Sequence, residues 1–583
     1  MLGLLALIAA LFVAGFAGSL IRRNEADQRT ANALAQAKEA LIGYAANYPD
    51  EHPGRVFGYL PCPDRDGGTG EGTADTACGG EDVTVIGRLP WRTLELPPLR
   101  DGDGECLWYA VSGNFKNNPS TDLMNWDTNG LIIIMAPNGS NFVAGGSGST
   151  AIPTRRAAAV IFAPGAILTG QDRSLAAIDP PTTCGGNYKA ANYLDTDATS
   201  AINNASAASA TKNALSKFIA AFNSNRTAAA ANLFDDRLIV ITADDIFLRR
   251  AQLRSDFLPY LNDPNPPQSK PRTGGMLRRA AECLVGYSQE NGSPINPQDR
   301  RLPWAAPIVL SNTGTVYGTA TNYADSALRY SGRLPFRVSA SASATGNSTV
   351  QGAGGQLLRE PPCPDQYWDT TTDAFWGNWK EQVFYAVARA YAPDSPSPTP
   401  ADACTQRECI TVDGVSGFAA VVILAGIKQA GQSRNIDVNP AYTSADKSNA
   451  ANYLEGVNAT AILQSNPSLE APRQFSKVAG NDTVMCISAS PASGLLYVDP
   501  TCSTPASTCT SNANSLAAYK SGNTNNCKLG TKSLLAACQN LAAMISSNNC
   551  SCKKSANDFI SKKCLDGFAD PKCQGAYTSL AAC

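Results

Sequence analysis

The chain begins with a long stretch that carries no charged side chain. Residues 1–21 are apolar or small, and Arg22 is the first charged residue. A helix of this length rises about 30 Å, roughly the thickness of the bilayer hydrocarbon. The pattern predicts a membrane-spanning helix. A signal peptide with a small-x-small cleavage site near Ala14–Ala17 is the alternative that stays open.

The polar stretch that follows keeps a helical period. Leu34, Ala37, Leu41, Ala45 and Tyr48 recur at spacings of three and four, which places them on one face of a helix. Prolines at positions 49 and 53 end this pattern. We therefore expect one helix over residues 1–48, about 70 Å long. Its first half would lie in the membrane and its second half would pack on a folded head.

Several short segments occur twice along the chain, mostly in the same order. The matched pairs are 37–44 with 280–287, 61–64 with 362–365, 87–92 with 332–337, 105–111 with 381–387, 190–195 with 450–455, and 235–242 with 481–488. The Leu-Pro-Trp element of Leu89–Trp91 is echoed once more at Leu302–Trp304. Such self-similarity predicts two copies of one domain.

Each copy places helical sequence before short β-branched runs bounded by Gly or Asn, such as Leu131–Met135, Ala157–Ala163 and Phe418–Ala425. We predict an α+β fold in which a long N-terminal helix packs on an antiparallel sheet, with this head duplicated. The expected parts are a membrane-spanning and amphipathic helix at 1–48, a first head at 49–262, a Pro-rich linker at 263–273, a second head at 274–489 and a disulfide-rich C-terminal extension at 490–583.

The number and spacing of the cysteines indicate the cellular compartment of the chain. It holds 18 Cys but one His, and no Cys-x-x-Cys spacing, which favours disulfides over a zinc or haem site. We expect an exported protein whose disulfides restrict the unfolded chain. The disulfide candidates are Cys62, Cys78, Cys106, Cys184, Cys404, Cys409, Cys502 and Cys509. Spacing alone leaves their pairing open.

Charge and motifs argue against two broad classes of function. The net charge is −2, and the chain lacks the basic patch that neutralises phosphates in a nucleic-acid binder. The histidine, His52, lies in an Asp-Glu-His-Pro turn, and neither a Gly-x-Ser-x-Gly elbow nor a Walker spacing is present. We therefore expect neither nucleic-acid binding nor enzymatic activity.

The apolar helix that continues into an amphipathic one, with strands after it, resembles the N-terminal organisation of type IV pilins and type II secretion pseudopilins. The resemblance implies that this helix sits in the inner membrane before assembly and in a filament core afterwards. The residues it would bury there are Leu4, Leu5, Ile8, Leu11, Phe12 and Phe16. The implied partners are other pilin or pseudopilin subunits, in a homo- or hetero-oligomeric filament.

Two departures from that family refine the expectation. The family's glutamate at the fifth mature position is missing, since Glu25 is the first acidic residue. Within the family its absence is characteristic of the large minor subunit at a filament tip. The family's basic leader ending in Gly is also absent, so Met1 is expected near the mature start.

Two acidic loops suggest a cation site. Asp64 and Asp66 lie in one glycine-rich turn, and Asp101 and Asp103 lie in another. Carboxylates at alternate positions of such turns suit calcium, and some pseudopilins hold a loop with this ion. Neither loop completes an EF-hand, so solvated turns are the competing interpretation. We expect no other cofactor.

The functional hypotheses differ in whether the chain polymerises. The first is a pilin-like structural subunit, large and of minor or tip type, of a type IV pilus or a type II secretion pseudopilus. It would reside in the inner membrane with a periplasmic head, or in an extracellular filament on the cell surface. The alternative is a membrane-anchored, disulfide-rich surface adhesin that never polymerises.

Overall fold

A computed structural model of the chain describes residues 2–52, 55–65, 70–120, 124–136, 141–142, 156–176, 181–206, 211–220, 234–247, 276–290, 301–310, 322–336, 338, 374–395, 404, 407–429, 431–432, 434, 444–489 and 496–503. The chain divides into two compact units. The first comprises residues 1–251 with 435–441, and the second residues 252–434 with 442–583. Asp66 and Cys509 lie outside the described residues, as do most of the predicted extension and the side chains of Leu4, Leu5, Ile8, Leu11, Phe12 and Phe16.

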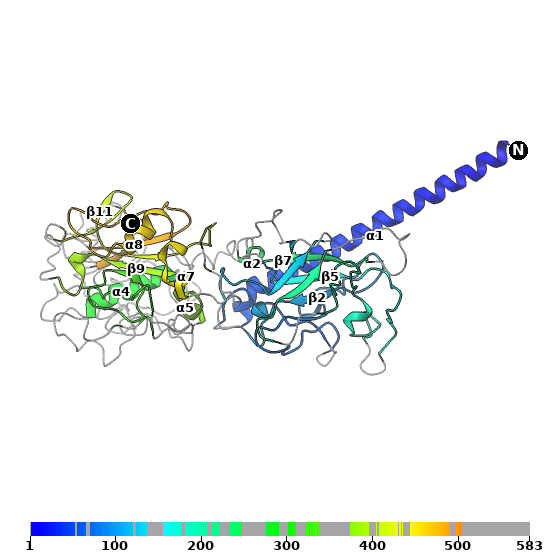
Figure 1. Cartoon of the computed structure of the whole chain (residues 1–583), viewed down its shortest axis with the longest axis horizontal. Helices are drawn as coiled ribbons and strands as arrows, with labels where there is room; N and C mark the ends of the chain where they lie inside the picture. The colour runs from blue at the N-terminus through cyan, green and yellow to red at the C-terminus, as the bar shows by residue number, and fades with distance from the viewer. Residues whose placement is uncertain are drawn as a thin grey trace, which may run out of the picture. The chain divides into compact units, whose positions relative to one another are not determined.

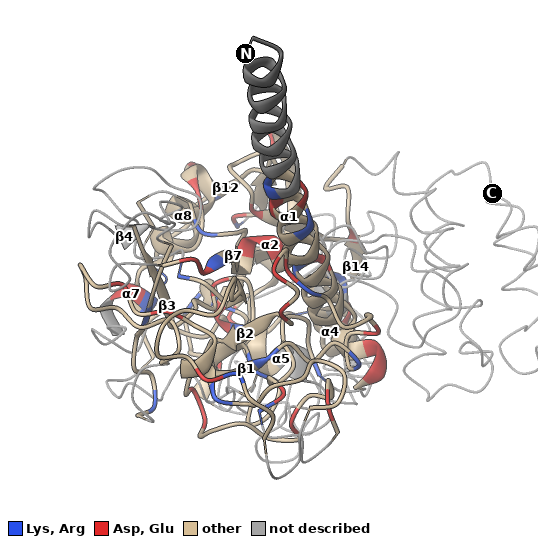
Figure 2. Ribbon diagram, turned by 90° about the vertical axis from the view of Figure 1, so that its right-hand side faces the viewer, with Lys and Arg blue, Asp and Glu red and all other residues tan. Residues whose placement is uncertain are grey.

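The first unit begins with one continuous helix, α1 (Leu2–Glu51). Its second half buries the predicted apolar stripe, including Leu34 and Leu41. This half lies against β5 (Ala159–Ala163) and β7 (Arg237–Ile241). The N-terminal part of α1 extends away from the rest of the unit (Figure 1). Charged residues of both signs follow on the described part of the helix (Figure 2).

Two sheets complete the first unit. β1 (Val85–Arg88), β2 (Trp108–Val111), β5 and β7 form an antiparallel sheet in the order β1-β2-β5-β7. A smaller sheet has the order β4-β3-β6, with bounds Asn141–Phe142, Ile132–Met135 and Ser216–Ile219. β3 and β6 run parallel. The chain passes through β5 between them, which supplies the long connection that a parallel pair requires.

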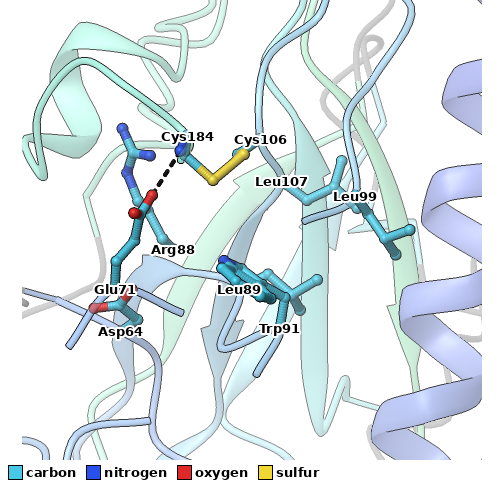
Figure 3. Close-up of a pocket in the computed structure, with 9 residues that line it drawn as sticks. All are labelled: Asp64, Glu71, Arg88, Leu89, Trp91, Leu99, Cys106, Leu107 and Cys184. Carbon is cyan, nitrogen blue, oxygen red and sulfur yellow. Dashed lines mark hydrogen bonds between the residues drawn. A yellow bond between two sulfur atoms is a disulfide. The ribbon is translucent and has the colours of Figure 1, made fainter. Parts of the chain in front are cut away.

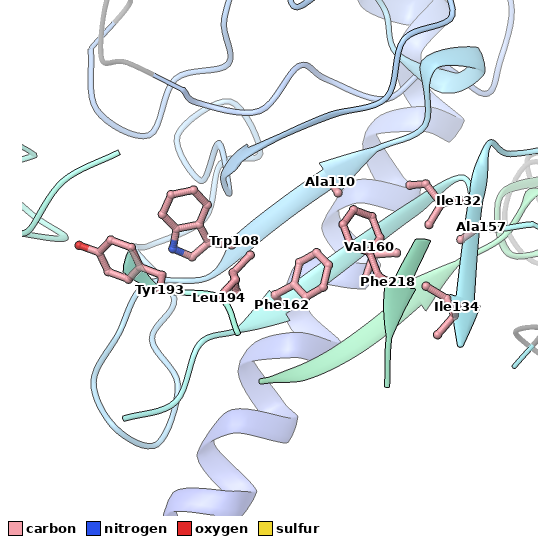
Figure 4. Packing of buried hydrophobic residues seen from close by; sticks show 10 residues of the cluster. All are labelled: Trp108, Ala110, Ile132, Ile134, Ala157, Val160, Phe162, Tyr193, Leu194 and Phe218. Carbon is pink, nitrogen blue, oxygen red and sulfur yellow. The ribbon is translucent and has the colours of Figure 1, made fainter. Parts of the chain in front are cut away.

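The core of the first unit lies between its two sheets. Successive side chains of a strand point to opposite faces, so β2 and β5 present one face to α1 and the other to the small sheet. The buried cluster on that second face consists of Trp108, Ala110, Ile132, Ile134, Ala157, Val160, Phe162, Tyr193, Leu194 and Phe218. Figure 4 shows these side chains gathered over the strands, with the α1 ribbon behind them. The unit is thus built in three layers: helix, large sheet and small sheet.

The second unit packs α4 (Met276–Glu290) on a larger sheet. Its strands are β8 (Ser331–Arg333), β9 (Val383–Val387), β10 (Ile410–Val412), β11 (Val415–Leu424), β12 (Gln474–Phe475), β13 (Thr483–Ala489) and β14 (Leu496–Asp499). β8, β9, β11, β13 and β14 follow one another as antiparallel neighbours, while β10 pairs antiparallel with β11 and parallel with β12.

Short helices connect the strands of both units. In the first they are η1 (Gly113–Phe115), η2 (Ala190–Asn192) and α2 (Ala243–Phe247). In the second they are α5 (Ala374–Trp379), η9 (Lys380–Gln382), η10 (Arg389–Tyr391), α7 (Ser444–Ser448), η11 (Ala450–Asn452) and α8 (Gly456–Leu463). η2 and η11 share the sequence Ala-Ala-Asn.

The two units share one sheet plan. The order β8-β9-β11-β13 repeats β1-β2-β5-β7, again with antiparallel neighbours throughout. The register repeats as well, since Gly87 lies opposite Tyr109 in one unit and Gly332 opposite Tyr385 in the other. Segments aligned from the sequence as Gly-Arg-Leu and Tyr-Ala-Val therefore occupy equivalent places.

One sequence match does not correspond to this shared plan. The Tyr109 hydroxyl donates to the carbonyl of Pro61, and the Tyr385 hydroxyl donates to that of Pro303, each over 3.1 Å. Pro61 is therefore the counterpart of Pro303, and not of the proline at 362, which lies outside the described residues. Continuing this alignment, Asp64 corresponds to Ala306, and the two form equivalent backbone bridges to the arginines of β1 and β8.

The predicted fold class is wrong on two points. The sheets are mixed rather than antiparallel, because β3–β6 and β10–β12 are parallel pairs. In addition, none of the helices in the part of the chain that the structure describes is long and apolar enough to cross a membrane. The membrane-spanning helix predicted over the first residues is corrected by this second finding.

Disulfides join four pairs of described cysteines. The S–S distances are 2.01 Å for Cys62–Cys78, 2.06 Å for Cys106–Cys184, 1.97 Å for Cys404–Cys409 and 1.95 Å for Cys486–Cys502. The last pair links β13 to the residues just after β14. The sheet of the second unit thus continues into the residues after 489, since β14 lies within the predicted extension at 490–583.

A buried ion pair organises the second unit. Arg473 donates from Nε and Nη2 to the two carboxylate oxygens of Glu408, each at 2.8 Å, and both side chains are fully buried. The same guanidinium also donates to the carbonyls of Tyr330 and Val387. The arginine thereby connects the segment before β12 to those around β8 and β9. Removing one member of such a pair strands the other charge away from water.

We expect Glu408→Gln to destabilise the second unit by about 3–5 kcal/mol, because the buried Arg473 guanidinium loses its counter-charge. Urea unfolding followed by tryptophan fluorescence measures the effect as a shift in midpoint. Glu470→Gln, at an exposed position, is the matched control and should change the midpoint little. A variant at 408 that unfolds like the control would show that this ion pair contributes little.

Candidate metal centre

A group of three aspartates lies at one end of the large sheet of the first unit. Asp195 follows η2, and Asp235 and Asp236 directly precede β7. One carboxylate oxygen from each of the three side chains lies within 4.8 Å of the other two. Among the residues that the structure describes, this is the group of three acidic, His or Cys side chains close enough to hold one metal ion.

Asp236 is the most deeply buried member. Its side chain is 2% exposed. Oδ2 accepts hydrogen bonds from the backbone N–H of Asp195 at 2.8 Å and from Nδ2 of Asn204 at 3.0 Å. Oδ1 is buried and has no hydrogen-bond partner in the described structure. Half of this carboxylate is therefore fixed by the fold, and the other half is left unsatisfied.

The other two aspartates are also positioned by hydrogen bonds. Oδ2 of Asp195 accepts from the backbone N–H of Asp235 at 2.9 Å, and its Oδ1 accepts from Nε2 of Gln171 at 2.9 Å. Oδ2 of Asp235 accepts from the N–H of Ala166 at 3.0 Å. Oδ1 of Asp235, like that of Asp236, is buried without a described partner.

The proximity of these carboxylates disfavours their ionised forms. Burial raises the pKa of Asp195. Burial, followed by the negative charge of Asp195, raises the pKa of Asp235 to about 7 and that of Asp236 well above its ordinary value. Arg173 opposes this effect, since its positive charge lowers the pKa of Asp195. At neutral pH the group therefore favours uptake of positive charge, either protons or a cation.

The acidic loop predicted at Asp101 and Asp103 lies beside this group, but its main carboxylate is already occupied. Oδ1 of Asp101 accepts the N–H groups of Asp103 at 3.0 Å and Glu105 at 2.9 Å. Its Oδ2 accepts the N–H of Gly165 at 2.9 Å. Asp101 thus holds its own loop and the residue after β5. Asp103 acts at a distance, because its charge contributes to raising the pKa of Asp235.

The other predicted acidic loop is partly outside the description. Asp64 is buried, and its Oδ2 accepts the N–H of Gly72 at 2.7 Å. Its backbone bridges to β1. Asp66 lies outside the described residues. Within the part of the chain that is described, Asp64, Asp101 and Asp103 are not brought into one group.

The second unit contains the same arrangement with one acid fewer. Its Asp482 occupies the place of Asp236, and Oδ2 accepts from the N–H of Glu455 at 3.0 Å and Nδ2 of Asn458 at 3.1 Å. Gln432 donates to Glu455 at 2.9 Å, as Gln171 does to Asp195. The counterpart of Asp235 is Asn481, whose Nδ2 donates to the carbonyl of Ile427 at 2.7 Å.

The two units also differ in how a glycine N–H is used. Gly426 follows β11 as Gly165 follows β5, and its N–H donates to Oδ1 of Asp482 at 3.4 Å. In the first unit the equivalent N–H is taken by Asp101 instead. This difference explains why Oδ1 of Asp236 has no partner while Oδ1 of Asp482 has one.

A second candidate ligand site is the small pocket near β1 that Glu71 and Arg88 help to line, and the side chains around it fill its interior (Figure 3). Glu71 accepts the N–H of Cys184 at 2.6 Å. The buried Arg88 guanidinium donates to the carbonyls of Gly185 and Asn187 and stacks 5.2 Å from the rings of Tyr188 and Tyr193. The lining leaves no room for a water molecule, because these side chains fill the space.

Comparisons with known proteins add no relative: no protein-family model, curated protein or solved structure matches this chain. The three aspartates were not singled out from the sequence, since Asp195 is separated from the other two by about forty residues. One signal was present in the aligned repeat, where Asp235-Asp236 faces Asn481-Asp482. An acid in one copy where the other copy has an amide marks a difference in chemistry between the copies.

The second unit should lose stability as pH rises from about 4 to about 7. Burial is the main cause that raises the pKa of Asp482 to about 7 in the folded chain. The folded state therefore binds this proton more tightly than the unfolded state, so its contribution is present at low pH and is lost as pH rises through the folded pKa.

Thermal melting of the wild type and Asp482→Asn between pH 4 and pH 8 measures this effect. The melting temperature of the wild type relative to the variant should fall as pH rises across the window, because the variant cannot titrate there. Glu470→Gln should follow the wild type at every pH. A constant difference between wild type and Asp482→Asn would show that Asp482 does not titrate in this range.

Proposed function

We propose that this chain is a structural subunit of an extracytoplasmic filament and that it assembles through the N-terminal part of α1. The observation that supports this proposal is the division of one helix into two halves. The second half is packed on the first sheet. The first half continues as the same helix, away from the rest of that unit (Figure 1).

The sequence of the first half indicates that it needs a partner. Residues 1–21 carry no charge and are apolar or small. A helix that is apolar on all sides is normally buried. The same segment of neighbouring copies provides a suitable surface, because helices with regular ridges of Leu, Ile and Phe pack closely against one another. Assembly of many copies along such helices produces a fibre.

Other features are consistent with a large subunit outside the cytoplasm. Disulfides persist in oxidising compartments, and four pairs are formed among the described cysteines. One N-terminal helix carries two compact units, which makes each subunit bulky. Bulky heads suit a sparse or terminal position, because subunits repeated along a fibre must pack densely.

Leu11→Arg should reduce the amount of chain in sheared surface filaments by at least about tenfold, because assembly would bury an unpaired charge at a cost of several kcal/mol. The measurement is an immunoblot of the sheared fraction against the cell fraction. Gln28→Arg places the same charge at an exposed position of the same helix and should assemble normally.

Proteolytic resistance of the two units should be the same in both variants, which separates assembly from folding. The proposal would be overturned if wild-type chain stayed entirely with the cells after shearing. That result would favour the alternative of a surface adhesin that does not polymerise.

A further inference from the structure

The unsatisfied oxygens of the aspartate group are the most informative feature of the first unit outside α1. A buried acceptor without a partner costs free energy, so native folds supply one from protein, water or an ion. Asp236 is 2% exposed, yet its Oδ1 has no described partner. Oδ1 of Asp235 is in the same state. Both side chains belong to the group in which one oxygen of each of the three aspartates lies within 4.8 Å of the other two.

The second unit shows how the same place in the fold is completed with one acid fewer. Asn481 replaces the acid at the position of Asp235 and donates to a backbone carbonyl. Gly426 supplies an N–H to Oδ1 of Asp482. In the first unit this position is an acid, and the equivalent N–H, from Gly165, donates to Asp101. The first unit thus has one more carboxyl group and fewer internal donors at the same place.

We propose that the first unit binds one calcium ion between Asp195, Asp235 and Asp236. Oxygens bound to one calcium at about 2.3–2.6 Å lie at most about 5 Å apart, which accommodates the observed spacing of up to 4.8 Å. The free Oδ1 atoms of Asp235 and Asp236 provide two ligands, and Asp195 provides the third. Waters complete the coordination, since calcium takes about 6–8 oxygens.

The donor set favours a hard cation with tolerant geometry. All three side chains are carboxylates, without the imidazole or thiolate that transition metals prefer. The oxygens are held by backbone and amide hydrogen bonds from separate segments rather than by a regular octahedral frame. Magnesium requires near-ideal octahedral geometry, whereas calcium accepts irregular sets. Calcium is therefore the ion to test, with magnesium as the competitor.

Binding would join three separate parts of the first unit. Asp195 belongs to the segment after η2, and the other two aspartates directly precede β7. Ala166, which holds Asp235, follows β5. The ion would thus fasten the loop after β5 and the segment after η2 to the first residues of β7, and should stabilise this end of the sheet.

The full-length chain, stripped with EGTA, is titrated with calcium alone by calorimetry and then melted with and without the ion. We expect one calcium per chain and a rise in melting temperature of roughly 5–10 °C at about a hundredfold excess over Kd. Asp235→Asn, which reproduces the residue of the second unit, should weaken calcium binding at least about tenfold. Its near-UV circular dichroism should remain that of the wild type.

Asp172→Asn is the matched control, because Asp172 is an exposed carboxylate in the same loop region and the variant should bind calcium like the wild type. The site assignment would be overturned if the wild type bound no calcium at about 10 mM, a concentration above that which saturates weak extracellular modules. It would equally be overturned if Asp235→Asn bound as tightly as the wild type, or if Asp172→Asn lost the ion. The assay uses the isolated chain, so its outcome is independent of filament assembly.

Discussion

Both units depend on a buried carboxylate at the start of the last shared strand. Asp236 and Asp482 each accept a backbone N–H from a segment distant in the sequence and an amide from a buried asparagine. Without these acceptors, two donors in each unit would be buried and unpaired, at about 1–3 kcal/mol each. The carboxylate therefore determines where the segment after η2 or η11 attaches to the sheet. The position of Tyr193 and Tyr453 follows from that attachment.

The ring of each of these tyrosines packs against a buried arginine from the first shared strand, β1 or β8. Arg88 lies 5.2 Å from the ring of Tyr193, and Arg333 lies 4.9 Å from that of Tyr453. The remaining donors are used differently in the two units. Arg88 reaches carbonyls beside the Cys106–Cys184 disulfide, whereas Arg333 reaches the carbonyls of Glu381 and Lys447. The side chains of those two residues form their own ion pair at 2.7 Å.

The two units thus keep a common hydrogen-bonded frame and differ in the partners that surround it. The Cys62–Cys78 disulfide of the first unit starts from a position that Trp304 occupies in the second unit. That ring packs edge-on against Tyr330, 5.1 Å between centroids. A covalent link in one copy is replaced by aromatic packing in the other, which is consistent with a frame that tolerates either solution.

The sequence predicted those parts of the fold that have a local apolar periodicity or that occur twice along the chain. The amphipathic half of α1 follows from its apolar spacing, and most aligned segments occupy equivalent strands because alternating burial requires the same residues in both copies. The match at 61–64 was misleading because shared Pro and Cys outweighed the Leu-Pro pair that the fold aligns. The parallel pairs β3–β6 and β10–β12 could not be predicted, since their partners are set by long connections rather than by composition.

The candidate site shows why acidic loops are poor guides to ligands. Asp101 lies in a glycine-rich acidic turn that suggests calcium binding, but its oxygens are used by three backbone N–H groups. By taking the N–H of Gly165, it leaves Oδ1 of Asp236 unsatisfied in the first unit. The predicted loop therefore lies beside the aspartate group, while the carboxylate of Asp101 is occupied by hydrogen bonds within its own surroundings. Only the hydrogen-bond partners distinguish a carboxylate that orders a loop from one that remains available.

The loop that contains Asp101 also contacts α1. It therefore links the proposed calcium site to the helix through which we propose the chain assembles. The N–H of Gly102 donates to Oγ1 of Thr30 at 2.9 Å. A Cβ at Gly102 would lie 2.4 Å from the carbonyl oxygen of Ala26, so this approach requires glycine. Asp101 therefore contacts the aspartate group through Gly165, while the next residue contacts the helix that leads to the apolar segment. A movement of Gly165 at the end of the sheet would therefore be transmitted to α1 through direct contacts of this loop.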